Sequence, residues 1–321
     1  MSGVSKILRL KELLAILISS RPRYVINKLF PGNRNVKSFP QMILPLLFAI
    51  FTLDAHSQSP DTTQDRGSQL IPWRVALVAG GTAGIITAAH LQNYDSWWKG
   101  VRGPFHLSVD DSYPLAADKC GHFLFSNDAA DIVGRSFAWS GIERSRAMLY
   151  GAGAAFAFQL YVEIEDGFHP DLGFSFGDIL ADGLGSCYPM LQEKCSVLQA
   201  ISPKWSAERS TRYDQGAYRT IFDDYESQNY WLSVNIDGIL GESAPRYIPS
   251  WLNIAVGYGV TNLDLHGNGD REFYLGFDID CNKLPGDGDF LKSVKHLLNY
   301  LHVPAPTIRL SPTLIGYGLR F

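Results

Sequence analysis

The sequence predicts an α+β protein, in which an N-terminal helical bundle of about four helices holds a polar cluster inside and a mainly antiparallel β portion of about four strands follows. Up to residue 200, ionisable and small residues recur four positions apart, as they do on one face of a helix. Beyond residue 230 the chain is rich in aromatic and β-branched residues between turn-forming segments. With 321 residues, 46% of them hydrophobic, it can bury a sizeable core.

The bundle is expected from four segments. The first, 73–90, fits either a short membrane helix packed through its glycines or a buried helix of a soluble bundle. In the third, Gly151 with Ala155 and Gly153 with Ala157 would let a neighbouring backbone approach closely. The fourth begins with Ser175, which fits a capping box with Asp178. The expected helices cover residues 73–90, 116–138, 143–165 and 175–191.

The β portion, 230–321, follows a polar segment at 201–229 that reads as a linker. A helical pattern at 290–301 interrupts it. The C-terminal alternation ends in Phe321, as the last strand of outer-membrane barrels does, but a barrel needs at least about eight strands of ~10 residues. This ending therefore indicates an outer-membrane destination or an edge strand. The expected strands are 230–236, 251–260, 272–280 and 307–321.

The N-terminal region reads as an export signal. Residues 42–57 join an apolar run to Ala55-His56-Ser57, which predicts cleavage before Gln58. Because Met42 opens a complete signal, residues 1–41 are either non-native or an extended n-region. The apolar run is alternatively an uncleaved anchor, although it falls short of the ~20 residues that span a bilayer. Residues 58–72 are polar and predict a flexible leader before a helical domain at 73–200.

The charge of the chain argues against nucleic acid as a partner. Residues 1–41 hold eight of the 28 Lys and Arg and one of the 32 Asp and Glu, and residues 42–57 add one more acid. Residues 58–321 therefore carry 20 basic and 30 acidic side chains. A surface of that sign excludes nucleic acid as the expected partner. The four cysteines form no Cys-x-x-Cys pair, which excludes a zinc ribbon, while Cys187 and Cys195 are either a disulfide pair or thiols.

The candidate site lies in the bundle. Asp118 and His122 are four apart on one expected helix, and Asp178 and Asp182 are four apart on another. Glu163 emerges from an apolar helix between them. If His122, Asp118, Glu163 and Asp178 meet, a histidine oriented by a carboxylate can serve as a catalytic base. A divalent metal is the second reading, with Asp166 and Asp182 as oxygen ligands and His122 as a nitrogen ligand.

The alternative for this cluster is structural. These acids would then satisfy Lys119, Arg144, Arg146 and helix N-termini in a buried network. No nucleophilic serine motif and no phosphate-binding glycine loop is present in the sequence. The identity of any cofactor is left open.

At this constellation the sequence resembles the YfiM-like predicted periplasmic lipoproteins, an uncharacterised envelope family, over roughly residues 73–192. In the third motif, Gly173-Phe174-Ser175 runs without the residue that the family places between Gly and Phe. The matching positions are Asp118, Lys119, His122, Glu163, Asp166, Asp178, Asp182 and Gly185. The resemblance implies a shared polar pocket but no reaction.

A more distant resemblance is to the VanZ-like membrane proteins. They share the Asp-Lys-x-x-His start and the separation between Glu163 and Asp178. Three positions depart from their pattern: Asp166, Leu172 and Asp182 stand where those proteins usually carry Gln, Arg and Asn.

Three functions follow as expectations. The first is an exported, non-enzymatic envelope protein, periplasmic or at the outer membrane, whose partner is the membrane or an envelope component. The second is a membrane-associated hydrolase or transferase that acts on a lipid or cell-wall precursor through the His122 cluster. The third, a small pore, rests on the C-terminal strand alone.

Overall fold

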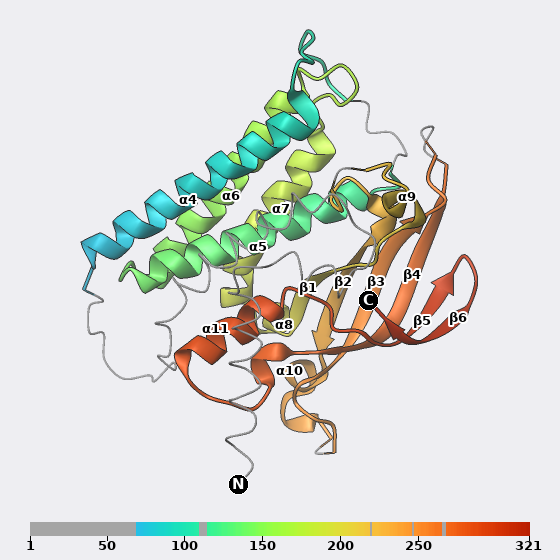
Figure 1. Ribbon diagram of the computed structural model, residues 1–321. Coiled ribbons are helices and arrows are strands. Elements are labelled where there is room, and N and C mark those ends of the chain that lie inside the picture. The colour runs from blue at the N-terminus through green and yellow to red at the C-terminus, as the bar shows by residue number, and fades with distance from the viewer. Residues whose placement is uncertain (1–68, 109–113, 219, 246, 265–267) are drawn as a thin grey trace, which may run out of the picture. The chain divides into compact units, whose positions relative to one another are not determined.

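The computed structural model describes residues 69–108, 114–218, 220–245, 247–264 and 268–321 (Figure 1). The predictions for the extended segment 1–41 and the signal 42–57 lie outside the described residues, as does most of the leader 58–72.

The four expected helices of the bundle are confirmed to within a few residues. Helix α4 is Pro72–Asn93, continued by a π-helical turn, η1 Tyr94–Trp98, and it precedes α5 Ala117–Trp139, α6 Arg144–Asp166 and α7 Phe176–Lys194. Helix α5 packs against both α6 and α7, and α6 also packs against α7. A short helix, α8 Ser196–Gln199, leads from the bundle into the sheet.

Small residues bring α5 and α6 into close contact. The sequence predicted such a contact for two pairs of small residues on α6, and it is found at one of them, Gly151 with Ala155. Gly151 is buried against the backbone of α5, where a Cβ would meet the carbonyl oxygen of Ala130. Ala155 is buried on the same face. The pair Gly153 and Ala157 is exposed, so the prediction of a second close contact there is wrong. A helix presents only one of two adjacent stripes to a given neighbour.

Among the described residues, two helical segments are long and apolar enough to cross a membrane by length and composition, Pro72–Trp98 and Arg144–Asp166. The second is explained as a helix of the bundle because it packs against both α5 and α7. In the first, only 6% of the residues in its most apolar stretch of 18 are buried, so the buried-helix reading of α4 is not supported. Trp73 begins this segment and Tyr94 and Trp97 end it, all exposed, which is the aromatic distribution of helices at membrane interfaces.

The second part is an antiparallel sheet in which strand order follows chain order, and it confirms the α+β class. Within the described residues the sheet has six strands rather than four, because 307–321 forms a hairpin and the first strand lies in the expected linker. The strands are β1 Ile201–Ala207, β2 Gln228–Asn235, β3 Leu252–Thr261, β4 Asp270–Ile279, β5 Ala305–Ser311 and β6 Ile315–Arg320.

Short helices join the strands, and the expected helix at 290–301 is confirmed as α11 Asp289–Leu298. The others are α9 Thr211–Asp214, η2 Tyr225–Ser227, α10 Ile236–Leu240, η3 Gly241–Ser243 and η4 Cys281–Lys283. All four cysteines are free, with Cys187 and Cys195 exposed, so they form no disulfide.

One face of the sheet is apolar and exposed. Strand register aligns four apolar side chains in a row across β2 to β5, and each is 42–51% exposed. The row is Leu232, Val256, Leu275 and Ile308. Ile254, Phe273 and Phe277 extend it along β3 and β4. We call these seven residues the outer face.

The other face of the sheet is largely polar and buried. Lys204, Ser233, Asn253 and Asp278 are each excluded from solvent there. Soluble sheets normally place apolar residues inside and polar residues outside, so this sheet is inverted. The inversion explains why β1 was predicted as linker: the side chains that it buries include Lys204 and Ser206, which carry no apolar alternation.

The buried polar face is enclosed because the sheet curls. Arg320 on β6 lies 2.9 Å from Glu208, next to β1, although these strands are the two edges of the sheet. In a flat sheet the edges would lie roughly 24 Å apart. The start of α5 covers one end of the sheet, where Leu115 and Ala117 pack with Tyr230.

Candidate metal and catalytic centre

Three helices of the bundle converge on one point. Helix α5 supplies His122, α6 supplies Glu163, and α7 supplies Asp178 and Asp182. Ligand atoms of His122, Glu163 and Asp178 all lie within 4.8 Å of one another. We call these four residues the His122 centre. Segments distant in the sequence therefore meet as their spacings predicted.

Asp182 holds the His122 ring through one nitrogen, and two further carboxylates face its other nitrogen. Its Nδ1 lies 3.1 and 3.2 Å from the two carboxylate oxygens of Asp182. Its Nε2 lies 3.8 Å from Oε1 of Glu163 and 4.0 Å from Oδ1 of Asp178. A carboxylate that holds one ring nitrogen while the other faces oxygen ligands is the arrangement of metal-binding histidines and of catalytic bases.

Asp182 is completely buried and fully engaged. Ser126 Oγ donates to it at 2.9 Å, and Gln159 Nε2 donates at 3.0 Å. Sequence reasoning missed both residues. The available signal was that Ser126 lies one turn beyond His122, and that Gln159 is a polar residue in an apolar run one turn before Glu163.

The predicted capping box is rearranged in a way that matters for the centre. Ser175 Oγ accepts from the backbone N–H of Asp178 at 3.0 Å, so Ser175 is the N-cap as expected. The backbone N–H of Ser175 donates to Oε2 of Glu163 at 3.0 Å. Glu163 therefore takes a role that the capping box would give to Asp178, and Asp178 faces the centre.

Asp118 pairs with Lys119, whereas Asp182 holds the His122 ring. Lys119 Nζ is 3.0 Å from Asp118 Oδ2 and 2.9 Å from Asp178 Oδ1. The expectation that Asp118 orients His122 is corrected, because Asp182 from another helix does so. Lys119 neutralises part of the cluster. Arg144 pairs instead with Glu193, and Arg146 pairs with Glu143.

Asp166 is held by the end of the first helical segment, where Trp98 Nε1 donates to its Oδ1 at 2.6 Å. The predicted metal set of Asp166 and Asp182 with His122 is therefore corrected. In the described part of the chain, the group with metal-ligand spacing is His122, Glu163 and Asp178. The carboxylates of Asp166 and Asp182 instead accept hydrogen bonds from Trp98 and Ser126.

Buried negative charge dominates the centre. Burial raises the pKa of Glu163 to about 8, against the opposing effects of His122 and the Ser175 N–H. Burial alone would lower the pKa of His122, but the hydrogen bond to Asp182 and the charges of Asp178, Asp182 and Glu163 raise it to about 9. Burial also raises the pKa of Asp166 to about 6. The centre therefore favours bound protons or another cation.

The outside edge of the centre is apolar. The segment between η1 and α5 and the segment between α6 and α7 are joined by backbone hydrogen bonds. In one of them the N–H of Ser108 donates to the carbonyl oxygen of Phe174 at 2.8 Å. Around this junction four apolar side chains are exposed, and Phe176, next to the cap Ser175, is 66% exposed. We call them the apolar rim: Phe105, Leu107, Leu172 and Phe176.

The fold and this centre define a helical bundle with a histidine and carboxylate site, joined to an inverted sheet. Residues 107–194, which contain α5, α6 and α7, match the model of a family described as "Predicted periplasmic lipoprotein" (DUF2279). The match supports an exported, envelope-associated location. The narrower likeness to YfiM-like and VanZ-like proteins stays a prediction. Comparison with curated proteins gives no match, and comparison with solved structures gives none either.

Proposed function

We propose that this chain is an envelope hydrolase or transferase that binds a divalent cation at the His122 centre and acts on a lipid or cell-wall precursor at a membrane face. One observation carries the proposal. His122 is fixed through Nδ1 by a buried carboxylate, while its Nε2 faces Glu163 and Asp178 at a spacing that suits a shared ion.

The chemistry of the donors fits such an ion. One imidazole nitrogen and two carboxylate oxygens suit Zn²⁺, Mn²⁺ or Fe²⁺ better than Ca²⁺. His122, Glu163 and Asp178 would hold the cation, which would supply Lewis-acid activation. Asp182 would keep the Nδ1 proton of His122 in place. Lys119, which pairs with Asp178, would turn to a negative group of the substrate.

The apolar rim supports a membrane-bound substrate. Phe176 and Leu172 flank Ser175, whose N–H holds Glu163, so exposed apolar surface adjoins the centre. A substrate with a lipid tail would place that tail along the rim and its polar group at the centre. The YfiM-like and VanZ-like resemblance, both of envelope or membrane proteins, agrees with this placement.

The metal is tested first. Protein stripped with EDTA is titrated with Zn²⁺, Mn²⁺ and Mg²⁺ by calorimetry, and His122→Ala and Asp178→Asn are expected to lose binding. Glu165→Gln, two residues from Glu163 on the same helix and paired with Arg102, is the control that keeps it. Asp182→Asn is expected to weaken binding by about tenfold or more, because outer hydrogen-bond partners orient the ligand. If the wild-type protein binds none of these ions, the proposal is refuted.

Turnover is tested separately. Purified protein is incubated with envelope lipid extract in vesicles, and products are followed by mass spectrometry. We expect cation-dependent product that disappears in His122→Ala. Phe176→Glu is expected to keep cation affinity and lose activity on vesicles. Cation binding without any product would overturn the catalytic part.

A second candidate is the non-catalytic envelope scaffold, in which the same cluster pins the bundle. It is favoured by the Ser175 N–H bond to Glu163 and by the Lys119 ion pair with Asp178, since both satisfy the acids within the fold. A cluster of this kind is destabilised when one partner is removed. Loss of folded protein in Asp178→Asn, with no cation binding in wild type, would favour this candidate.

A further inference from the structure

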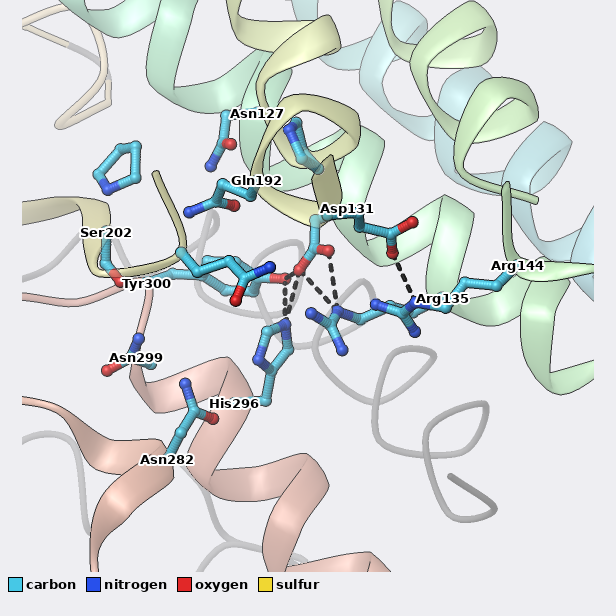
Figure 2. A pocket seen from close by; sticks show the side chains of 14 residues that line it. Asn127, Asp131, Arg135, Arg144, Gln192, Ser202, Asn282, His296, Asn299 and Tyr300 are labelled. Atoms are coloured by element: carbon cyan, nitrogen blue, oxygen red, sulfur yellow. Dashed lines mark hydrogen bonds and ion pairs between the residues drawn. The ribbon is translucent and has the colours of Figure 1, made fainter. Parts of the chain in front are cut away.

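A second polar site lies apart from the His122 centre, where α5 and α7 meet α8, the start of β1, η4 and the helix α11. It is a cavity of about 370 Å³ (Figure 2), within the ~300–1,000 Å³ range of ligand sites. Five of its lining residues are side-chain amides: Asn127, Gln192, Gln199, Asn282 and Asn299.

The charged groups of this cavity are paired with one another. Asp131 accepts from Arg135 Nε at 2.8 and 2.9 Å, from His296 Nε2 at 2.6 Å and from Tyr300 Oη at 2.7 Å (Figure 2). Arg144 Nε lies 2.5 Å from Oε1 of Glu193. Each cation has its anion, so the cavity offers no net charge to a ligand.

His296 also fits this neutral balance. Burial lowers its pKa, and the charge of Arg135 lowers it further, against the effect of Asp131. A lowered pKa favours the neutral ring, which donates to Asp131 when its proton is on Nε2. Arg135 and Arg144 approach the cavity from the same side (Figure 2), and each already pairs with a carboxylate through its Nε.

One buried atom points to a missing partner. Asn127 is 4% exposed, and its Nδ2 donates to Asp128 at 2.9 Å. Among the described residues its Oδ1 has no hydrogen-bond partner. A buried acceptor left unpaired costs ~1–3 kcal/mol, and Asn127 lines the cavity. Because this oxygen is shielded from solvent, a ligand hydroxyl would reach it, and remove that cost, once the Asn127 side chain turns it toward the cavity.

We propose that this cavity binds a neutral saccharide unit. A side-chain amide presents a donor and an acceptor side by side, as a sugar's neighbouring hydroxyls do. Asn299 provides the hydrogen-bond donor. Its Oδ1 accepts from the N–H of Cys281 at 2.9 Å, so its amide hydrogens are left to donate to a ligand. Asn127 and Asn299 thus supply an acceptor and a donor to one polyol ligand.

Calorimetry or saturation-transfer NMR on the full chain tests this proposal. The probes are N-acetylglucosamine and chitobiose, glucose and maltose, and inorganic phosphate. We expect millimolar or tighter binding of at least one saccharide and none of phosphate. Preference for the N-acetylated pair would assign a cell-wall type of glycan, and preference for the glucose pair a soluble one.

Variants locate the binding. Asn282→Trp fills the cavity from an exposed position, so folding is preserved, and is expected to weaken saccharide binding about tenfold or more. Gln199→Trp is a second exposed variant of the same kind. Gln215→Trp, an exposed amide elsewhere, is the control and should bind as wild type. No saccharide binding, binding of phosphate instead, or unchanged affinity in both cavity variants would overturn the proposal.

Discussion

Lys204 Nζ of β1 lies 2.7 Å from Asp278 Oδ2 of β4, and both side chains are fully excluded from solvent. Two strands separate β1 from β4, which would place them roughly 14 Å apart in a flat sheet. The pair therefore requires the curl that encloses the polar face. Asp278 also accepts from Ser233 Oγ at 2.6 Å and from Val303 N at 3.0 Å, so the charge is well solvated by the protein.

Lys204→Met is expected to lower the free energy of unfolding by ~3–5 kcal/mol, because it leaves the Asp278 carboxylate buried without its cation. Chemical denaturation measures the change. Lys292→Met, at an exposed position of α11, is the control and should change stability by less than about 0.5 kcal/mol. A Lys204→Met protein as stable as wild type would contradict the buried pair.

Gly151→Ala is expected to destabilise the bundle by ~1–3 kcal/mol, because the new methyl group would meet the backbone of α5 at Ala130 and Gly134. Gly153→Ala, two residues along the same helix, has nothing within 4 Å. There the substitution should be neutral or stabilise by up to ~1 kcal/mol through helix propensity. Equal effects at the two positions in thermal unfolding would argue against the close α5 and α6 contact.

Glu163→Gln is expected to change how stability depends on pH in protein stripped of metal. Burial raises the pKa of Glu163 to about 8, whereas a glutamate in an unfolded chain titrates near about 4.3. Between these values the unfolded state has released the proton and the folded state keeps it. Wild-type stability therefore falls as pH rises through this window.

The glutamine cannot ionise and can still accept from the Ser175 N–H. Relative to wild type it should gain on the order of 3–4 kcal/mol between pH 5 and pH 8. Denaturation at a series of pH values measures this difference. Glu165→Gln should follow the wild-type curve, since its carboxylate pairs with Arg102 outside the centre. A constant difference across pH would show that Glu163 is already ionised in the fold.

The outer face of the sheet is expected to bind lipid. It joins seven exposed apolar residues with no charge among them, and apolar-out with polar-in is the pattern of strands that face a bilayer. Leu275→Lys should reduce co-flotation with phospholipid vesicles, because it places a charge at the centre of the row. Tyr247→Lys, which is 86% exposed and lies between β2 and β3, should float as wild type. Association of wild type into dimers without vesicle binding would assign the face to a second copy instead.

The bundle helices and the residues of the centre followed from local rules. Helical spacing placed Asp178 and Asp182 on one face, and Ser175 was recognisable as a cap because capping involves residues three apart. Strands β2, β3 and β4 were recognisable from aromatic and β-branched content. β1 was not, because its buried residues are polar and its partners lie at least twenty residues ahead.

The sequence by itself determined the four bundle helices, α11 and strands β2 to β4, and that one histidine and several acids share helix faces. Tertiary structure alone decided their roles: that Asp182 rather than Asp118 orients His122, that Glu163 takes the cap N–H, and that the sheet buries its polar face. The physical reason is the distance along the chain over which each interaction acts. Capping and helical periodicity act within a few residues, whereas the partner of a buried charge is set by which helices and strands pack together.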